Sequence, residues 1–233
     1  MFYPKVVDEE ETVSKLIAGA SIARYGDGEL KLCLGKSIKC QDYDINLSIA
    51  LKKILKSSGA CLVGIPRIND LSFMTEQKKK FWTSFASNKY TSLYYPNMRY
   101  YSSFITRPDS VPSLYTQEYF DSIKRIWEGK KVILINGDNR KMDRDQSLFD
   151  NCTYTRWEAP AQNAWSEYWS ILGQCAMQPK DTVFVLGLGP TATVLAYELN
   201  MLGYQALDLG HIGMFYSKFK EGKALDFDKR KAQ

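Results

Sequence analysis

The sequence predicts an α/β fold in which a mostly parallel sheet is covered by helices on both faces. Short apolar segments of strand length alternate with longer segments that carry apolar residues at helical spacing. Three of the strand-like segments, residues 61–65, 131–135 and 182–186, are mostly apolar, which is typical of parallel strands buried on both faces. Polar, glycine-containing clusters follow several of them, and these clusters fall at the carboxyl ends where such sheets bind ligands.

The alternation assigns most of the chain to regular elements. The expected strands cover residues 21–25, 61–65, 131–135, 182–186 and 204–209. The expected helices cover residues 9–18, 44–55, 75–86, 117–127, 164–177 and 191–202. The helix over 44–55 is well patterned, because Leu47, Leu51 and Ile54 fall on one side of it. Pro66 ends the second strand, because proline has no N–H to donate to a ladder.

The region from residue 90 to 119 differs from this pattern. It contains three prolines and a concentration of aromatic residues, namely Tyr90, Tyr94, Tyr95, Tyr100, Tyr101, Phe104, Tyr115 and Tyr119. Such a composition indicates an inserted, loop-rich region. Exposed tyrosine rings could stack on sugars, or the tyrosines could pack a small subdomain, and the sequence leaves both interpretations open.

Length and composition limit the class of protein. At 233 residues, with 45% hydrophobic and 24% charged residues, the chain can bury the core of one domain. No apolar run approaches the roughly 20 residues of a membrane-spanning helix, and the first residues show no signal-peptide pattern. A cytoplasmic location is therefore expected. Five scattered cysteines and a single histidine argue against a disulfide framework or a structural zinc site.

The net charge of +5 suits anionic small molecules or an anionic membrane surface. Nucleic acid is not an expected partner, because the basic residues do not gather into a face that the sequence reveals. The densest cluster, Lys78-Lys79-Lys80, is expected to be a solvated helix face. The basic tail over 218–233 is a solvated segment or a weak contact with anionic lipid.

The first candidate site follows the strand over 21–25. Asp27 and Glu29 are separated by one small residue, so both carboxylates can reach a hard divalent cation. Gly26 and Gly28 permit a sharp turn and close approach of a ligand to the backbone. Arg24 supplies a fork suited to phosphate or carboxylate. A surface turn is the competing interpretation of the Asp-Gly pair.

The second candidate lies between the strand over 182–186 and the next helix. Gly187, Gly189, Pro190 and Thr191 lead into the helix N-terminus, where backbone N–H groups and the helix dipole favour an anion. We expect a phosphate to bind here. The same residues match the G-x-G-x-x-A pattern of dinucleotide-binding folds, with Asp208 placed where a ribose-binding acid would lie.

The third candidate follows the last expected strand. His211 is the only histidine in the chain, and it comes after Gly210 and three residues after Asp208. At that sheet edge it could ligate a metal, contact a diphosphate or transfer a proton. A weaker signal is the polar run over 136–140, which could contact a base, ribose or acceptor or could form a plain turn. Another is Asn163, which could cap a helix.

Taken in order, these segments resemble the bacterial GT-D fold glycosyltransferases, a family long described as a domain of unknown function. The similarity runs from about residue 22 to residue 211 and rests on a series of short motifs. These are RYGDGE, Gln41-x-Tyr43-Asp44, the GI-Pro of residues 63–66, the stretch over 159–165, GLGPTA and DLGH.

The resemblance implies a Rossmann-like fold, a UDP-sugar donor and a divalent cation, Mn²⁺ or Mg²⁺, at an Asp-x-Glu motif. Carried onto this chain, the motif is Asp27 and Glu29, with Arg24 and His211 near the diphosphate. Asp27, Glu29 and His211 are then the expected catalytic and metal-binding residues. The resemblance also implies a role in building surface glycans or glycosylating surface proteins.

On this basis we expect one glycosyltransferase domain over residues 1–233, with residues 75–120 on the acceptor side. The sequence leaves open the sugar, the acceptor, the linkage and the oligomeric state. Two other hypotheses stay open on the residues alone. One is an NAD- or S-adenosylmethionine-dependent enzyme that uses the glycine pattern. The other is a noncatalytic carbohydrate-binding protein that uses the tyrosines.

Overall fold

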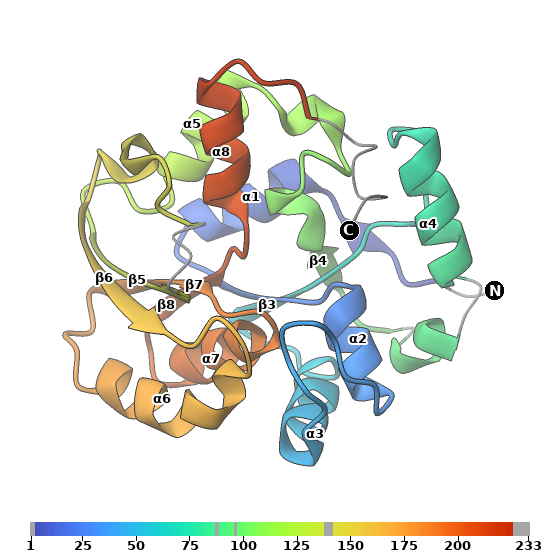
Figure 1. The fold of residues 1–233 in the computed structure, drawn as a ribbon, viewed down its shortest axis with the longest axis horizontal. Helices are drawn as coiled ribbons and strands as arrows, with labels where there is room; N and C mark the ends of the chain where they lie inside the picture. Colours follow the sequence, from blue (N-terminus) through green and yellow to red (C-terminus); the bar gives the residue numbers. More distant parts are fainter. Residues whose placement is uncertain (1–2, 87–88, 96, 138–141, 226–233) are drawn as a thin grey trace.

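A parallel sheet lies between two layers of helices, as Figure 1 shows. The fold is that of a computed structural model, which describes residues 3–86, 89–95, 97–137 and 142–225. Within these residues the sheet has eight strands in the order β1-β4-β3-β2-β8-β7-β5-β6, and its neighbouring strands run parallel. The strands are β1 Val6–Val7, β2 Ser21–Arg24, β3 Cys61–Ile65, β4 Tyr100–Ser102, β5 Lys131–Gly137, β6 Thr153–Ala159, β7 Thr182–Gly187 and β8 Gln205–Asp208.

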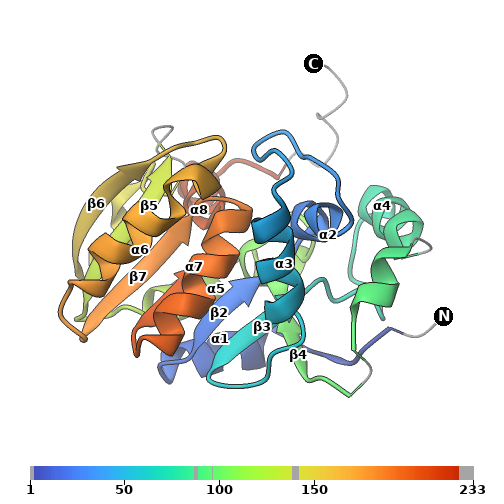
Figure 2. The same cartoon turned by 90° about the horizontal axis from the view of Figure 1, so that it is seen from below.

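The helices cover both faces of this sheet. The α-helices are α1 Glu9–Ile17, α2 Asp27–Cys33, α3 Ile45–Ile54, α4 Glu76–Ala86, α5 Gln117–Lys124, α6 Tyr168–Ala176, α7 Pro190–Met201 and α8 Ile212–Lys220. Five short 3₁₀ helices join them: η1 Lys89–Leu93, η2 Ser103–Thr106, η3 Pro112–Leu114, η4 Gln146–Phe149 and η5 Ala164–Glu167. Helices α3, α6 and α7 cover one face, and α1, α5 and α8 cover the other (Figures 1 and 2).

Local sequence explains where several helices begin. Asp8 caps α1 by accepting a hydrogen bond from the backbone N–H of Glu11 at 2.8 Å. Asp44 caps α3 in the same way, accepting from Asn46 and Leu47 at 2.8 and 2.9 Å. These side chains satisfy N–H groups that have no partner within the helix.

The strand order places a topological switch point between β2 and β8. From β2 the chain moves outward through β3 and β4, whereas β7 and β8 return inward from the other side until β8 pairs with β2. In Figure 2 the arrows of β2, β3 and β7 point the same way, and α2 lies at the end to which they point. Sheets of this kind bind ligands in the crevice at such a point.

The structure confirms the predicted fold class and contains every strand and helix that the sequence predicts. It adds elements that the sequence pattern does not reveal: β1, β4, β6, α2 and α8. Strand β6 lies at the edge of the sheet with its residues half-buried or exposed, so it lacks an apolar run. Helix α2 begins inside the glycine-rich RYGDGE segment, whose composition indicates a turn.

The aromatic region over 90–119 is packed into the core. Tyr90, Tyr94, Tyr100 and Tyr119 are each less than a tenth exposed, so these rings are not available for stacking on sugars. Residues 100–102 also form β4, which pairs with β3 and β1 inside the sheet. The interpretation of a packed region is therefore confirmed for these four tyrosines.

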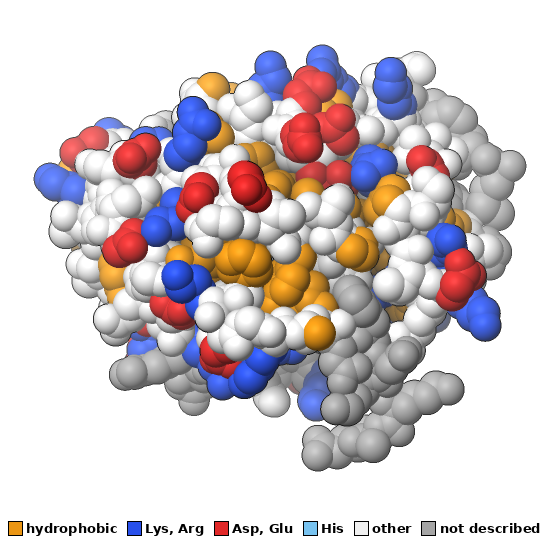
Figure 3. Space-filling view, turned by 90° about the horizontal axis from the view of Figure 1, so that it is seen from above, with side chains coloured by type: hydrophobic (Ala, Val, Ile, Leu, Met, Phe, Trp, Pro, Cys, Tyr) orange, Lys and Arg blue, Asp and Glu red, His pale blue; other side chains and the backbone are white. Residues whose placement is uncertain are grey.

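The surface agrees with the modest net charge. On the face drawn in Figure 3, Lys and Arg side chains are interspersed with Asp and Glu around a hydrophobic area. No helix within the described residues is long and apolar enough to cross a membrane. The cysteines form no disulfide in the described part of the chain. Most of the basic tail, residues 226–233, lies outside the described residues.

Candidate active site

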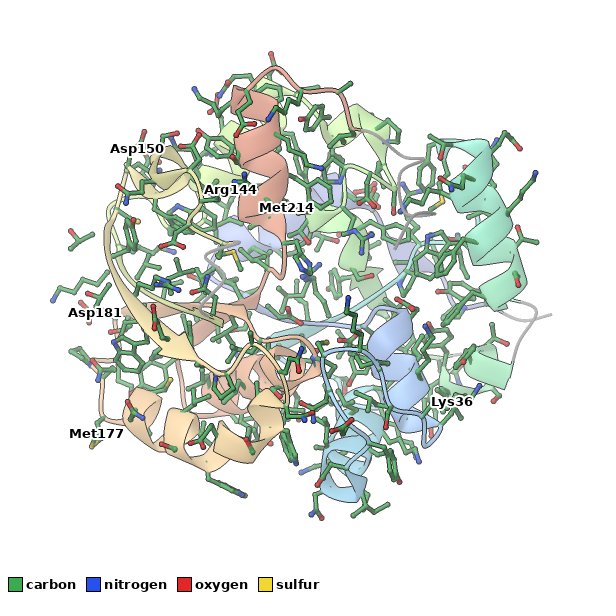
Figure 4. All side chains as sticks on the ribbon, in the orientation of Figure 1. Lys36, Arg144, Asp150, Met177, Asp181 and Met214 are labelled. Atoms are coloured by element: carbon green, nitrogen blue, oxygen red, sulfur yellow. The ribbon has the colours of Figure 1, made fainter. Side chains whose placement is uncertain are left out.

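A cavity of about 590 Å³ opens at the carboxyl ends of the strands, around the switch point. Most of the site residues predicted from the sequence line it: Arg24, Gly26, Asp27, Gly28, Glu29, Gly187, Gly189, Pro190, Asp208 and His211. Lys36 and Met214, labelled in Figure 4, mark the loop after α2 and the first turn of α8, two helices that begin at this cavity. Thr191 does not line it and is fully buried at the start of α7.

Arg24 joins the two strands of the switch point. Its Nε donates to the backbone carbonyl of Asp208, and its Nη2 lies 3.4 Å from Asp208 Oδ1. Its Nη1 donates to the Ser103 carbonyl at 3.0 Å and to the Thr106 hydroxyl at 2.5 Å. The Thr193 hydroxyl of α7 is 3.1 Å from Asp208 Oδ2. Four of the five guanidinium N–H groups thus donate hydrogen bonds within the protein. Arg24 therefore holds together several of the segments that line the cavity.

Asp208 is held on several sides in this network. Burial raises the pKa of Asp208, and the charge of Arg24 with hydrogen bonds from Arg24 and Thr193 opposes that rise. Gly210 follows with a positive φ of +53°, and a Cβ atom there would lie 2.7 Å from Arg24 Nη2. Glycine at this position therefore serves both the backbone conformation and the close packing of the guanidinium.

Glu29 is the third residue of α2, and its side chain stabilises the start of that helix. Its Oε2 accepts a hydrogen bond of 2.7 Å from the backbone N–H of Gly26, which lies just before the first helical residue. Burial raises the pKa of Glu29 to about 7, with smaller increases from the charges of Asp208 and Asp27. A partly buried carboxyl that titrates near neutral pH is suited to accepting a proton.

Asp27 is the first residue of α2 and is more accessible than Glu29. Its side chain is 40% exposed and forms an ion pair of 2.5 Å with Lys31, one helical turn later. Such surface pairs contribute little free energy, so a ligand or cation can compete for the carboxylate. Within the described residues no group of three or more His, Cys, Asp and Glu side chains is arranged to hold a metal ion.

His211 lines the cavity from the start of α8. It is the exposed residue immediately before α8, and it follows the sharp turn made by Gly210. Both His211 and Asp27 line the cavity. The structure thus brings the three predicted catalytic residues, Asp27, Glu29 and His211, to one cavity from two separate helix starts.

The glycine turn after β7 leaves room for a ligand against the backbone. Gly189 caps α7 with a φ of +55°, and the backbone N–H of Ala192 donates to its carbonyl at 2.9 Å. A Cβ atom on Gly187 would lie 3.0 Å from Met142 Cε. Side chains at this turn would fill the space beside the N-terminus of α7, where an anion is favoured.

Asn136 is a cavity residue that the sequence indicates only weakly. It is the next-to-last residue of β5, opposite Gly187 of β7, and its Oδ1 accepts a hydrogen bond of 3.2 Å from Arg156 Nε. Among the described residues its Nδ2 has no acceptor. A buried donor without a partner costs free energy, and a ligand oxygen placed there would remove that cost. The neighbouring Asp138, Asn139 and Arg140 lie outside the described residues.

Sequence reasoning missed two cations of the site. Lys78 of α4 and Arg107, which follows η2, both line the cavity and both bind Asp109. The sequence suggests a solvated face for Lys78, because three lysines in a row give no sign that one of them points inward. The short spacing from Arg107 to Asp109 is the only local signal for this ion pair.

Two further motifs, residues 41–44 and 159–165, contact each other. Asn163 occupies the N-cap position of η5, but its side chain makes no capping hydrogen bond. Instead its Oδ1 accepts from the backbone N–H of Asp42 at 2.7 Å, and its Nδ2 donates to the Asp42 carboxylate at 2.9 Å. The Trp165 indole N–H donates to Asp44 at 3.0 Å. The Gln41–Asp44 segment and the stretch over 159–165 therefore hold one another in place.

Comparison with known proteins agrees with this geometry. The model of the family described as glycosyltransferase GT-D fold matches residues 22–230. Two similar proteins are a probable glycosyl transferase Gly of Streptococcus gordonii, 31% identical over 216 residues, and a glycosyltransferase GlyD of Streptococcus pneumoniae, 30% identical over 223 residues. These matches cover 88% and 91% of this chain but 31% and 27% of the relatives, so the chain spans about a third of their length.

Solved structures give the same result for the fold. A domain described as having a distinct glycosyltransferase fold is 32% identical, with a TM-score of 0.86 over 94% of this chain and 83% of that one. A structure described as a new glycosyltransferase from Streptococcus sanguinis is 30% identical, with a TM-score of 0.84 over 95% of this chain and 87% of that one.

Proposed function

Because this chain belongs to the glycosyltransferase GT-D fold family, we propose that it transfers a sugar from a UDP-sugar donor to a glycan, lipid-linked or protein-linked acceptor. The reaction would serve the synthesis of a bacterial surface polysaccharide or glycoprotein. The protein would work in the cytoplasm, at the inner face of the membrane where a lipid-linked acceptor resides.

One observation carries the proposal. A single cavity joins the carboxylates of Asp27 and Glu29 to the glycine turn at the N-terminus of α7 and to His211. An anion-binding turn beside carboxylates that can hold a cation suits a donor with a diphosphate. The dinucleotide alternative has less support, because Asp208 already accepts hydrogen bonds from Arg24 and Thr193 and has little capacity left for a ribose hydroxyl.

The residues fit a divalent cation that arrives with the donor. Mg²⁺ and similar ions are often held by one or two carboxylates together with substrate phosphates and water. Asp27 would hold the ion, and the remaining ligands would be phosphate oxygens and water. The ion would stabilise negative charge on the departing nucleoside diphosphate.

The chain's own groups have distinct tasks in this account. The backbone of the Gly187–Pro190 turn and the N-terminus of α7 would receive a phosphate, and His211 would donate a hydrogen bond to the diphosphate. Glu29, with its raised pKa, would accept the proton of the acceptor hydroxyl as the new glycosidic bond forms. The main role of Arg24 would be to hold the ends of β2 and β8 together through Asp208, and contact with the donor would be secondary.

The raised pKa of Glu29 predicts a pH dependence. As a base Glu29 must be ionised, so kcat/KM should rise with pH through about 7 and then level off. Glu29→Gln keeps a side-chain oxygen for the Gly26 N–H but should lower kcat by roughly 10²–10⁴-fold and remove that rise. Rate measurements on both proteins from about pH 5.5 to 9 test this, and an unchanged profile in Glu29→Gln would assign the proton to another group.

The same shift gives an independent check on Glu29. Its folded pKa is raised above the ordinary carboxyl value, so the unfolded state releases the proton more readily as pH rises. The free energy of unfolding of the wild type, relative to that of Glu29→Gln, should therefore fall as pH rises from about 4.5 to about 7 and stay constant above that. A difference that does not change with pH would contradict the raised pKa.

The transfer reaction itself is tested by UDP release. The purified protein with Mn²⁺ is incubated with UDP-hexoses and UDP-N-acetylhexosamines, and in parallel with sugars linked to other nucleotides. The released nucleotide is measured with and without added glycan acceptors. We expect at least one donor to release UDP faster with Mn²⁺ than with a chelator. Absence of release from every UDP-sugar, together with release from a sugar linked to another nucleotide, would overturn the choice of donor.

A further inference from the structure

The cavity contains a pair of cations on the side away from the expected nucleotide. Lys78 Nζ donates to Asp109 Oδ2 at 2.6 Å, and Arg107 donates to both Asp109 oxygens, through Nε at 2.7 Å and Nη2 at 2.8 Å. The third guanidinium nitrogen, Nη1, takes no part in that pair. The cluster carries two positive charges and one negative charge, so it retains an excess positive charge in the cavity wall.

The protein holds the cluster of Lys78, Arg107 and Asp109 in a fixed arrangement. The side chains of Lys78 and Asp109 are 20% and 14% exposed, so both are held in a largely desolvated place. Burial raises the pKa of Asp109, but its hydrogen bonds and charge interactions with Arg107 and Lys78 outweigh this effect and hold the pKa well below its ordinary value. The carboxylate therefore stays ionised and fixes the two cations in position.

The strand order separates this cluster from the glycine turn. Lys78 follows β3, and Arg107 follows β4, on the β3–β4 side of β2. The turn at Gly187–Pro190 and Asn136 lie on the other side, at the ends of β7 and β5. Figure 1 shows α4 on one side of α2 and strands β5 and β6 on the other. The carboxylates of Asp27 and Glu29 lie between the two halves, and both interact electrostatically with Arg107.

The same wall carries an aromatic surface. Phe81 lines the cavity one helical turn after Lys78 on α4, and the residue is 46% exposed. Trp82 packs edge-on against it at a centroid distance of 5.0 Å and is itself buried. An exposed ring can stack on the apolar face of a sugar, and adjacent cations can hold an anionic group on that sugar.

We propose that Lys78 and Arg107, fixed by Asp109, bind a phosphate group on the acceptor, and that the acceptor is a phosphorylated sugar whose ring stacks on Phe81. This inference rests on the proposed function, because it assigns the other half of the same cavity to the nucleotide-sugar. It also fits an acceptor linked through phosphate to a carrier, since the phosphate would then lie next to the first sugar ring.

A binding experiment separates the two halves of the cavity. NMR titrations with glucose 1-phosphate and with methyl glucoside are performed on the protein saturated with UDP and Mg²⁺, and UDP affinity is measured separately by calorimetry. We expect glucose 1-phosphate to bind about tenfold more tightly than methyl glucoside, because each charge-assisted contact contributes about that factor. Lys78→Gln should remove most of this preference and change UDP affinity less than about twofold.

Controls keep the outcomes distinct. Lys78→Gln leaves the Arg107–Asp109 pair in place, so folding should be preserved, and Arg107→Gln is the second test. Lys80→Gln removes the same charge from an exposed position of α4 that does not line the cavity, and it should change neither affinity. Equal affinities for glucose 1-phosphate and methyl glucoside would overturn the proposal. A fall in UDP affinity in Lys78→Gln would also overturn it, by assigning the pair to the donor diphosphate.

Failure of the donor proposal would be seen in a different measurement. If calorimetry detects no UDP binding to the wild type, the proposed donor is wrong, and the titrations are repeated without UDP. A preference for glucose 1-phosphate that Lys78→Gln removes would then still support the anion site, and its absence would overturn it.

Discussion

Asp27→Ala is expected to lower kcat for sugar transfer by about 10³-fold or more, with the protein still folded. The carboxylate is the most accessible acid in the cavity, and it is the residue proposed to hold the cation beside the diphosphate. Loss of one group that stabilises transition-state charge costs about 10²–10³-fold in known cases, and loss of the metal ion as well would add to this. Initial rates of UDP release at saturating donor and Mn²⁺ measure the effect.

The structure predicts little change in stability for this variant. Asp27 contributes an exposed ion pair one helical turn from Lys31, and such pairs are worth about 0.3–0.5 kcal/mol. Lys31→Ala is the matched control, because it removes the same ion pair and keeps the carboxylate. We expect Lys31→Ala to retain transfer within about threefold. Near-normal turnover in Asp27→Ala would show that the cation site has been placed on the wrong residue.

Arg24→Met is expected to destabilise the fold by about 3–5 kcal/mol, the largest stability effect that we predict. The guanidinium is 11% exposed and holds β2, β8 and η2 together, and its removal leaves Asp208 as a buried charge without its cationic partner. Equilibrium unfolding in urea, with comparison of the transition midpoints, measures the change. Activity should fall with stability, because the same residue supports the cavity floor.

A double-mutant cycle checks the reason for that loss. Asp208→Leu removes the stranded charge, so the double variant Arg24→Met/Asp208→Leu should be more stable than the sum of the two single effects predicts. The expected coupling is of order 1–3 kcal/mol. Additive single effects, or a loss below about 1 kcal/mol in Arg24→Met, would mean that Arg24 is held at the site for ligand contact and contributes little to the fold.

Much of the sheet could be predicted because its central strands carry their own signal. Residues 132–135 and 183–186 are apolar throughout, and both segments lie in strands buried between the helix layers. The edge strand β6 could not be recognised from the sequence. Its residues are half-buried or exposed, so the strand does not need a continuous run of apolar residues. Helix α2 was hidden for a different reason: Glu29 satisfies the Gly26 N–H and so starts a helix within a sequence that favours turns.

The site shows the same division between local and long-range information. Asp27, Glu29 and His211 come shortly after strands, and Gly187 ends one, so the rule that ligands bind at strand ends finds them. Lys78 and Arg107 belong to segments joined only by Asp109, and that ion pair depends on how α4 packs against the residues after β4. Thr191 shows the converse: it belongs to the glycine motif, yet the first turn of α7 directs it into the core.

The most direct test of the central claim is the melting temperature of the purified protein with UDP, with and without Mn²⁺, compared with NAD and S-adenosylmethionine. A ligand that binds only the folded state raises the melting temperature by mass action. The account predicts a rise with UDP that grows with Mn²⁺ and is lost in Asp27→Ala. A rise with NAD or S-adenosylmethionine alone would contradict it and would assign the Asp27–Glu29 motif to different chemistry.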